Sequence, residues 1–164
     1  MPKLTQVPSG SLDSVFYIHY SLPYYYDCFG KELMKITVTK DQVLDALQQV
    51  QTVVSTRTTL PILSNVLLRA SGETLELTTT DLDVGIRRKV SATVSRAGAT
   101  SLPARRLFSI VRELPDGQIE IEVDEKNIAS ISCGSSFFKI VGLPAEEFPP
   151  LPKLESGKTY NISQ

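Results

Sequence analysis

Three polar residues recur at helical spacing in the second half of the chain, and their side chains can bind phosphate. Arg105, Ser109 and Arg112 stand at positions i, i+4 and i+7, so a helix places all three on one face. Guanidinium groups form charge-assisted hydrogen bonds with phosphate oxygens, and such contacts carry no information about base sequence. The pattern therefore predicts sequence-independent binding of a polyanion, with an ordinary solvated helix face as the alternative.

Cations and amides earlier in the chain can extend this face. Lys40, Gln48 and Gln49 lie on the polar side of a first predicted helix, and they join the arginines if the two helices lie side by side. Arg57 follows that helix, on the polar side of a rigid turn that contains Pro61. The sequence has neither the aromatic and basic interleaving of a single-strand binder nor the pattern of a base-reading helix.

Residues suited to catalysis or to metal binding are few. His19 is the only histidine, and the chain has no nucleophile, phosphate-loop or metal-ligand motif. Asp81 and Asp83 are typical turn residues. A metal-dependent nuclease or transferase that uses Asp81, Asp83 and Glu113 is one alternative function, and a protein interaction module that does not bind DNA is another. The main expectation includes no catalytic residue, no metal and no cofactor.

The elements that position these residues repeat along the chain. A capping signal at Thr39 and Gln42 starts the first helix, and Pro103 suits the first turn of the second. Each helix follows a strand and precedes three strands, and the two copies are separated by about 64 residues, an offset read from the pattern itself. The predicted strands are 35–39, 62–70, 74–80 and 84–94 in the first copy, and 99–102, 118–123, 127–132 and 136–141 in the second. We expect an α+β fold, in which a duplicated β-α-β-β-β unit packs two adjacent helices on antiparallel sheets.

Composition limits the class of protein. The 164 residues are 41% hydrophobic with a formal net charge of −1, so the chain can bury a core but is unsuited to coat nucleic acid at random. A local basic face remains compatible with this balance. Cys28 and Cys133 have no metal-ligand spacing. We expect a reduced intracellular chain, with one disulfide between them as the alternative.

The two ends of the sequence differ from its middle. Residues 15–26 are apolar and aromatic but too short to span a bilayer, and no signal-peptide pattern surrounds them. We expect residues 1–33 to be a disordered extension or an upstream translation, with Met34 as the true start. Residues 34–148 form the predicted domain. Residues 149–164 read as a proline-rich linker and the first strand of a truncated second domain, so we expect a fragment of a longer chain.

Four ordered motifs resemble those of a known family. They are T-L-P-I-L-S-N at 59–65, L-T-T-T-D-L-D at 77–83, L-P-A-R-R-L-F at 102–108 and F-x-I-x-x-L-P-A-E-E-F-P at 138–149. Together they resemble the first domain of the bacterial DNA polymerase III β subunit family, the sliding clamps. The resemblance runs from Met34 to about Pro152, then faintly to Gln164, and residues 1–33 have no part in it.

The resemblance implies a DNA clamp fold and a role as a processivity factor. In this family two subunits close head-to-tail into a ring that encircles duplex DNA and tethers the replicative polymerase. It implies that Arg57, Arg105 and Arg112 face DNA. It further implies an accessory subunit without an active site, located in the cytoplasm and not in a membrane. The polymerase catalytic subunit and the clamp loader would bind through domains that are absent from this chain.

The resemblance also implies a contact between subunits. Phe138 and Ile140 match positions on the last strand that meet the neighbouring subunit, and Arg106 can add a charge pair. An alternative is that Phe138 and Ile140 are core residues of that strand. Ser135 and Ser136 stand in the preceding turn where some relatives carry basic residues, which weakens any charge pairing from that turn.

Overall fold

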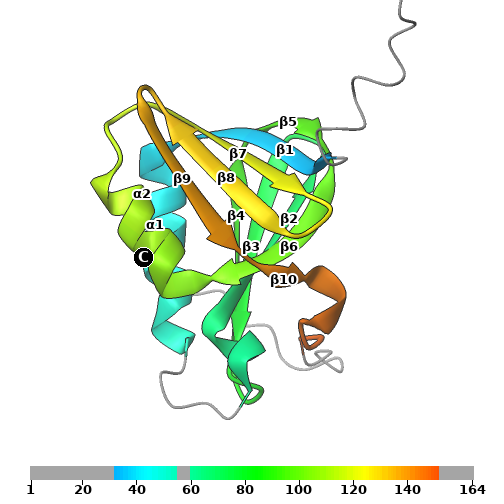
Figure 1. Cartoon of the computed structure of the whole chain (residues 1–164). Helices are drawn as coiled ribbons and strands as arrows, with labels where there is room; N and C mark the ends of the chain where they lie inside the picture. The colour runs from blue at the N-terminus through cyan, green and yellow to red at the C-terminus, as the bar shows by residue number, and fades with distance from the viewer. Residues whose placement is uncertain (1–31, 55–59, 152–164) are drawn as a thin grey trace, which may run out of the picture.

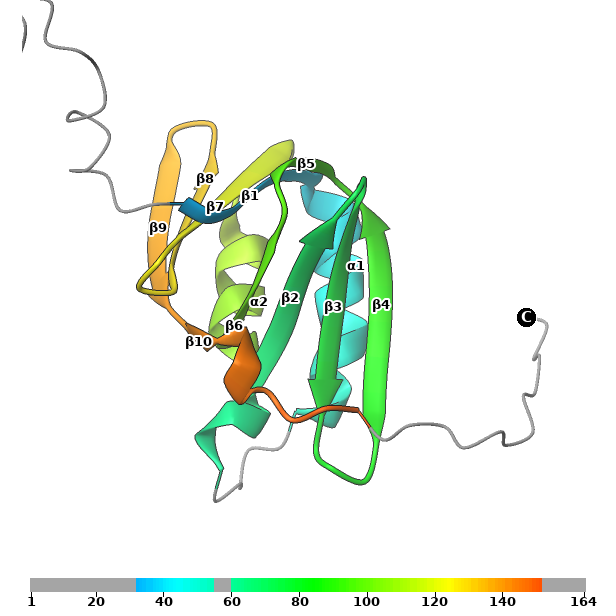
Figure 2. The same ribbon diagram turned by 90° about the vertical axis from the view of Figure 1, so that its right-hand side faces the viewer.

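The computed structural model describes residues 32–54 and 60–151, which form two α-helices and two antiparallel sheets. The first copy contains β1 (Glu32–Thr39), α1 (Lys40–Val50), the 3₁₀ helices η1 (Gln51–Val53) and η2 (Pro61–Ser64), β2 (Asn65–Ser71), β3 (Thr74–Thr80), β4 (Gly85–Ser91) and β5 (Thr93–Arg96). The second contains β6 (Gly98–Pro103), α2 (Ala104–Glu113), β7 (Gln118–Asp124), β8 (Ile128–Cys133), β9 (Ser136–Val141), β10 (Leu143–Pro144) and the 3₁₀ helix η3 (Ala145–Glu147). Helices α1 and α2 lie side by side on one side of the molecule, with the strands beside them (Figures 1 and 2). The α+β class with two adjacent helices packed on antiparallel sheets is confirmed.

Each sheet combines strands from both copies of the repeat. The strand orders are β5-β1-β7-β8-β9 and β10-β6-β2-β3-β4. Strand β1 pairs with β5 of its own copy and β7 of the other, and β6 correspondingly pairs with β10 and β2. The two copies are therefore related by the same pattern of pairing, and each copy completes a sheet of the other.

Three predicted boundaries differ from the structure. Strand β1 begins at Glu32, three residues before the predicted strand 35–39. The predicted strand 62–70 begins only at Asn65, because Pro61 opens a short 3₁₀ helix in which the Leu63 amide donates to the Leu60 carbonyl at 3.1 Å. The predicted strand 84–94 is divided at Ala92 into β4 and β5, which belong to different sheets.

Helix α1 is held at both ends by contacts with distant residues. Thr39 occupies the predicted N-cap position, but its side chain makes no capping hydrogen bond. The first helical amide, that of Lys40, instead donates to the carbonyl of Gly117 at 3.0 Å. At the other end the hydroxyl of Thr79 donates to the carbonyl of Val50 at 2.7 Å. Tertiary contacts, not the predicted capping box, therefore fix the ends of this helix.

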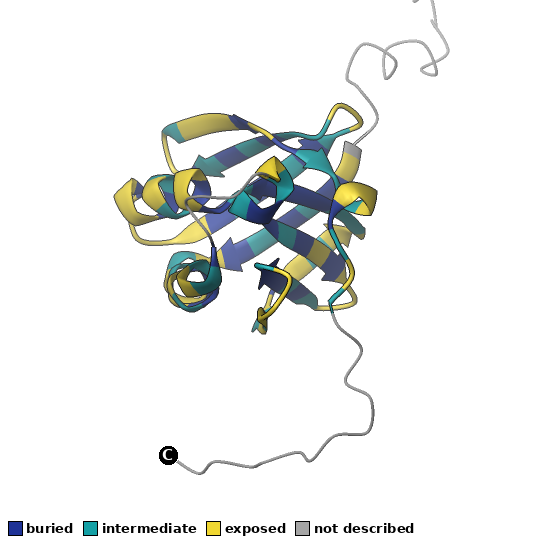
Figure 3. Ribbon diagram, turned by 90° about the horizontal axis from the view of Figure 1, so that it is seen from below, coloured by how far each residue is buried: buried dark blue, intermediate teal, exposed yellow. Residues whose placement is uncertain are grey.

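The apolar stripes of the two helices meet a core shared by both sheets. Val43 and Leu47 of α1 and Leu107 and Val111 of α2 are all fully buried within this core. Buried positions alternate with partly exposed positions along β7 and β8, which gives this part of the sheet a core face and a more accessible face (Figure 3). No helix in residues 32–54 and 60–151 is long and apolar enough to cross a membrane.

Candidate nucleic-acid interface

The arginines of α2 lie on its exposed side, opposite the buried stripe. Arg105, Ser109 and Arg112 are all exposed, and the Ser109 hydroxyl donates to the carbonyl of Arg105 at 2.9 Å. The Arg112 guanidinium lies 3.2 Å from a carboxylate oxygen of Glu113 and 5.9 Å from the ring centroid of Phe108. Both Arg112 contacts are at the surface, so they orient the side chain weakly and leave it accessible to an anion. The predicted placement of these three residues on one helical face agrees with the structure.

Lys40 has a different position from the one expected. Its ammonium group donates to the carbonyl of Leu114, just after the end of α2, and to the carboxylate of Asp116 at 3.0 Å. Only 13% of the Lys40 side chain is exposed. Because a cation stabilises the carbonyl end of a helix, Lys40 links the start of α1 to the end of α2. Its ammonium group is engaged within the domain, and the expected contact with phosphate stays a prediction.

Replacing Lys40 with methionine is expected to lower the free energy of unfolding by about 1–2 kcal/mol, because the Leu114 carbonyl loses its charged donor. Urea denaturation followed by circular dichroism measures this change. Asp116→Asn is the control, since the Asp116 side chain is 92% exposed and its ion pair contributes little. Equal losses in the two variants would assign the effect to the ion pair and contradict the carbonyl cap.

The two glutamines of α1 that were predicted to join this face differ in their surroundings. Gln48 is exposed, whereas Gln49 donates from its side-chain amide to the carboxylate of Asp45 at 2.9 Å. Arg57 lies outside the described residues. The described part of the predicted face therefore consists mainly of the α2 arginines and Gln48.

One cation beside this face was missed from the sequence. Arg88, on β4, reaches α1, where its guanidinium lies 3.8 Å from a carboxylate oxygen of Asp45. Ile86 and Val90, two residues away on each side, pack against the core, so Arg88 shares the core-facing side of the strand. The alternation of residues 86, 88 and 90 was the signal that could have identified it.

Strand β9, the predicted subunit contact, lies at the edge of its sheet. Phe138 is 39% exposed there, but Ile140 is 1% exposed and belongs to the core. The core interpretation is therefore correct for Ile140, whose side chain is not available to a partner subunit. Arg106 is exposed on α2, and α2 contacts β9. The exposed side chains on the other face of β9 include Phe137 and Val141.

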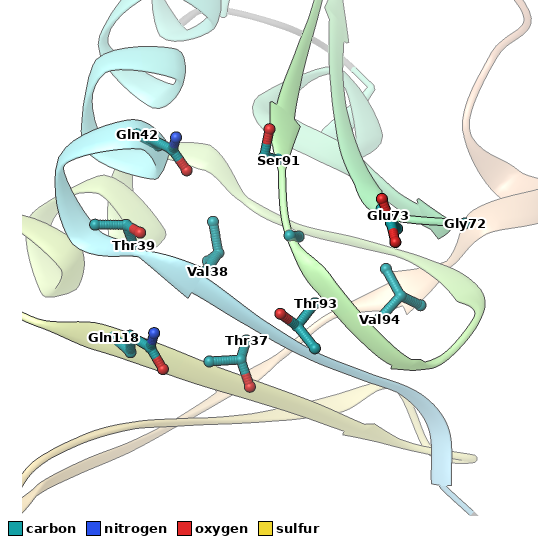
Figure 4. Close-up of a pocket in the computed structure, with 11 residues that line it drawn as sticks. Thr37, Val38, Thr39, Gln42, Gly72, Glu73, Ser91, Thr93, Val94 and Gln118 are labelled. Carbon is teal, nitrogen blue, oxygen red and sulfur yellow. The ribbon is translucent and has the colours of Figure 1, made fainter.

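A polar pocket of about 630 Å³ lies beside the start of α1, between β1 and the segment that joins β4 to β5 (Figure 4). Its lining is mostly hydroxyl and amide groups, including Thr37, Thr93, Gln42 and Gln118, and among the described residues that line it only Glu73 is charged. A pocket whose one charge is a carboxylate does not suit phosphate.

The residues of the alternative acidic site are not arranged as a metal site. A carboxylate oxygen of Asp81 accepts hydrogen bonds from the backbone amides of Asp83 at 3.1 Å and Val84 at 2.7 Å, and these bonds close the predicted turn. Within the described residues no three histidine, cysteine or acidic side chains are grouped to hold a metal ion. Cys133 is buried, with its thiol 3.4 Å from the carbonyl of Pro115.

Comparisons with known proteins agree on one family. Residues 34–152 match the family described as DNA polymerase III beta subunit, N-terminal domain. The beta sliding clamp of Proteus mirabilis is 40% identical over 133 residues, which are 80% of this chain and 36% of that protein. The beta sliding clamp of Chlamydia trachomatis is 32% identical over 132 residues, or 80% of this chain and 32% of that protein.

Solved structures give the same result. The sliding clamp of Bacillus subtilis superposes with a TM-score of 0.73 at 34% identity, covering 76% of this chain and 35% of that one. The clamp of Caulobacter crescentus gives a TM-score of 0.71 at 39% identity, covering 74% and 34%. The chain spans about a third of the length of the relatives that it matches. The fold, the ordered motifs and these matches show that the chain belongs to the DNA polymerase III beta subunit family, of which it carries the N-terminal domain.

Proposed function

We propose that this chain is part of a sliding clamp, the processivity factor of a replicative DNA polymerase. Two subunits would close head-to-tail into a ring, with α1 and α2 on its inner side and duplex DNA passing through it. The observation that carries the proposal is the exposed arginine face of α2, on the side of the domain where the two helices lie together. The relatives named beta sliding clamp support it.

The chemistry of that face suits holding DNA without stopping on it. Arg105 forms no ion pair with a carboxylate of the described residues, and the one carboxylate partner of Arg112, Glu113, is exposed. Guanidinium groups that meet phosphates directly or through water do not distinguish bases, so the duplex can move past them. Processivity would then come from the closed ring and not from affinity, with Arg57, Gln48 and Gln49 as further contacts to the backbone.

The partners of this domain follow from the same proposal. We place a second clamp subunit at the edge of β9, with Phe138 as an apolar contact and Arg106 as a charged one. The polymerase catalytic subunit and the clamp loader would bind elsewhere in the complete protein. The role is that of an accessory subunit in the bacterial cytoplasm, with no catalytic step assigned to this domain.

Arg105→Ala tests the DNA face. The logarithm of the association constant of the chain for a short duplex falls linearly with the logarithm of salt concentration, and the variant is expected to reduce that slope by about 0.9. Fluorescence anisotropy with a labelled duplex measures the slope. Arg69→Ala removes an equal charge from the outer face of β2, where neighbouring Leu68 and Ala70 point into the core, and should leave the slope unchanged. Equal slopes for wild type and Arg105→Ala would contradict the proposed face.

The ring is tested with the complete protein that carries this domain. If the protein encircles DNA, it should stay bound to circular DNA after it has been loaded, and it should be released once the DNA circle is cut. Equal retention on circular and linear DNA would argue for simple binding without encirclement. No salt-dependent retention on either DNA would favour the alternative, a protein interaction module that does not bind DNA.

A further inference from the structure

Strand β4 carries three consecutive cations, and only one of them faces the helices. Arg87 and Lys89 both pair with Glu76 of β3, at 3.3 and 3.6 Å. Glu76 lies between the buried residues Leu75 and Leu77, so these pairs are on the face of the sheet turned away from the core. Arg88 points to the opposite face and reaches α1, where its partner is Asp45.

This position matters because the rest of the helix layer is electrically balanced. The charged residues of 40–50 and 104–116 are the cations Lys40, Arg105, Arg106 and Arg112 and the anions Asp41, Asp45, Glu113 and Asp116. A layer with equal numbers of positive and negative groups attracts a polyanion only locally. Within the described residues, Arg88 adds one positive charge to the surface formed by α1, α2, the turn that follows α2 and the adjoining edge of β4.

We propose that Arg88 is a further phosphate-binding residue of this surface, with Asp45 as an internal counter-ion that phosphate displaces. The inference rests on the proposed function, since it extends the same DNA face from α2 across α1 to the edge of the sheet. Helix α1 packs against β4, so the added cation adjoins the helix layer.

The geometry of the Arg88 and Asp45 pair favours such an exchange. The two side chains are 49% and 64% exposed and 3.8 Å apart, so solvent screens their attraction. A phosphate offers the guanidinium two oxygens at shorter distance, which makes a stronger charge-assisted contact. Asp45 keeps the hydrogen bond from the Gln49 amide at 2.9 Å after Arg88 has turned away. The exchange therefore leaves no charged group without a partner.

The position of Arg88 on an edge strand suggests a different role, protection of that edge. Charged residues that point inward on an edge strand prevent it from pairing with other chains, and β4 is the last strand of its sheet. In that case Arg88 would protect the edge and would not respond to DNA. The two roles predict different results in one experiment.

The experiment uses the full 164-residue chain with ¹⁵N-labelled arginine and a short mixed-sequence DNA duplex. We expect the side-chain Nε–Hε signals of Arg88, Arg105 and Arg112 to shift together, with one dissociation constant, and to return at high salt. The signal of Arg87 should stay in place. Arg87 is the matched control, because it is the neighbouring residue with similar exposure, 52%, and its own carboxylate partner, but it faces the other side of the strand.

Variants provide an independent readout. Arg88→Ala is expected to reduce the salt slope of DNA binding by about 0.9, while Arg87→Ala leaves it unchanged. Asp45→Asn removes the competing anion and should tighten DNA binding about two- to fivefold, the range set by the strength of exposed ion pairs. The side chains of Arg87, Arg88 and Asp45 are 52%, 49% and 64% exposed, so all three variants should keep the urea midpoint of the wild type, which excludes misfolding as a cause.

The outcomes separate this inference from the proposed function. If Arg105 and Arg112 shift while Arg88 does not, the further inference is overturned and the DNA face stands. If none of the three shifts, both proposals fail together. Equal effects of Arg87→Ala and Arg88→Ala would mean that net charge alone matters, which also overturns the assignment of Arg88.

Discussion

Replacing Ile140 with alanine is expected to lower the free energy of unfolding of the chain by about 3–4 kcal/mol. The side chain is 1% exposed and belongs to the core, and on the neighbouring strand it is paired with Ala129, which is also fully buried. Removing its three outer carbons loses their transfer free energy and leaves a cavity that a close-packed core refills only in part. Urea denaturation monitored by circular dichroism measures the loss.

Two variants of the same strand serve as controls. Phe138 is 39% exposed and Val141 is 70% exposed, so alanine at either position should cost less than about 1 kcal/mol in the isolated chain. A loss at Ile140 as small as that at Val141 would contradict its place in the core. The comparison also decides which residue is useful for studying subunit contact. Phe138→Ala can test the proposed subunit contact without unfolding the domain, whereas Ile140→Ala acts first on stability.

The repeat could be predicted from the sequence because its signals are local. Apolar residues at helical spacing, turn residues and alternating strands each depend on neighbours within a few positions. The helix N-caps lie at Thr39 and Pro103, which reproduces the predicted offset of about 64 residues. Arg105, Ser109 and Arg112 lie on one exposed face for the same reason, since a single helix fixes their relative directions.

Contacts between distant residues could not be predicted in this way. Lys40 was placed on the polar face of its helix, but its partner Leu114 is 74 positions away, and only the packing of α1 against α2 brings them together. For Ile140 the sequence leaves two interpretations open, a subunit contact and a core position, because an apolar residue on the last strand suits both. Arg88 required the knowledge that β4 lies beside α1.

The junctions between sheets also escaped the sequence pattern. Near the end of each copy the chain passes from one sheet to the other. It does so at Ala92, between β4 and β5, in the first copy and at Gly142, between β9 and β10, in the second. The amide of Ala92 donates to the carbonyl of Glu73 at 3.0 Å, and the amide of Gly142 donates to the carbonyl of Asn127 at 2.8 Å. The junctions thus make equivalent hydrogen bonds after equivalent hairpins, although one carries a methyl group and the other does not.

Gly142→Ala is therefore expected to destabilise the chain by about 3 kcal/mol, even though alanine is native at the equivalent position of the first copy. A Cβ at position 142 would lie 2.7 Å from the Leu102 side chain and 3.0 Å from the Asn127 carbonyl oxygen, and closer still to the carbonyl oxygen of Ser101. Backbone atoms of β6 would have to move to make room for the methyl group, and such overpacking lowers the free energy of unfolding.

Thermal and urea unfolding of Gly142→Ala measure this loss, with Ala92→Gly as the matched reverse change. Ala92 is 9% exposed, and its conversion to glycine should cost only about 0.5–1 kcal/mol, through backbone entropy and one lost methyl group. Because the pattern of hydrogen bonds is the same at both junctions, a larger loss of stability for Gly142→Ala than for Ala92→Gly must come from the closer packing at the second junction. If Gly142→Ala costs no more than Ala92→Gly, the close approach of β6 to the second junction is wrong. If it costs several times more, the two copies share a pairing pattern but differ in how tightly their junctions are packed.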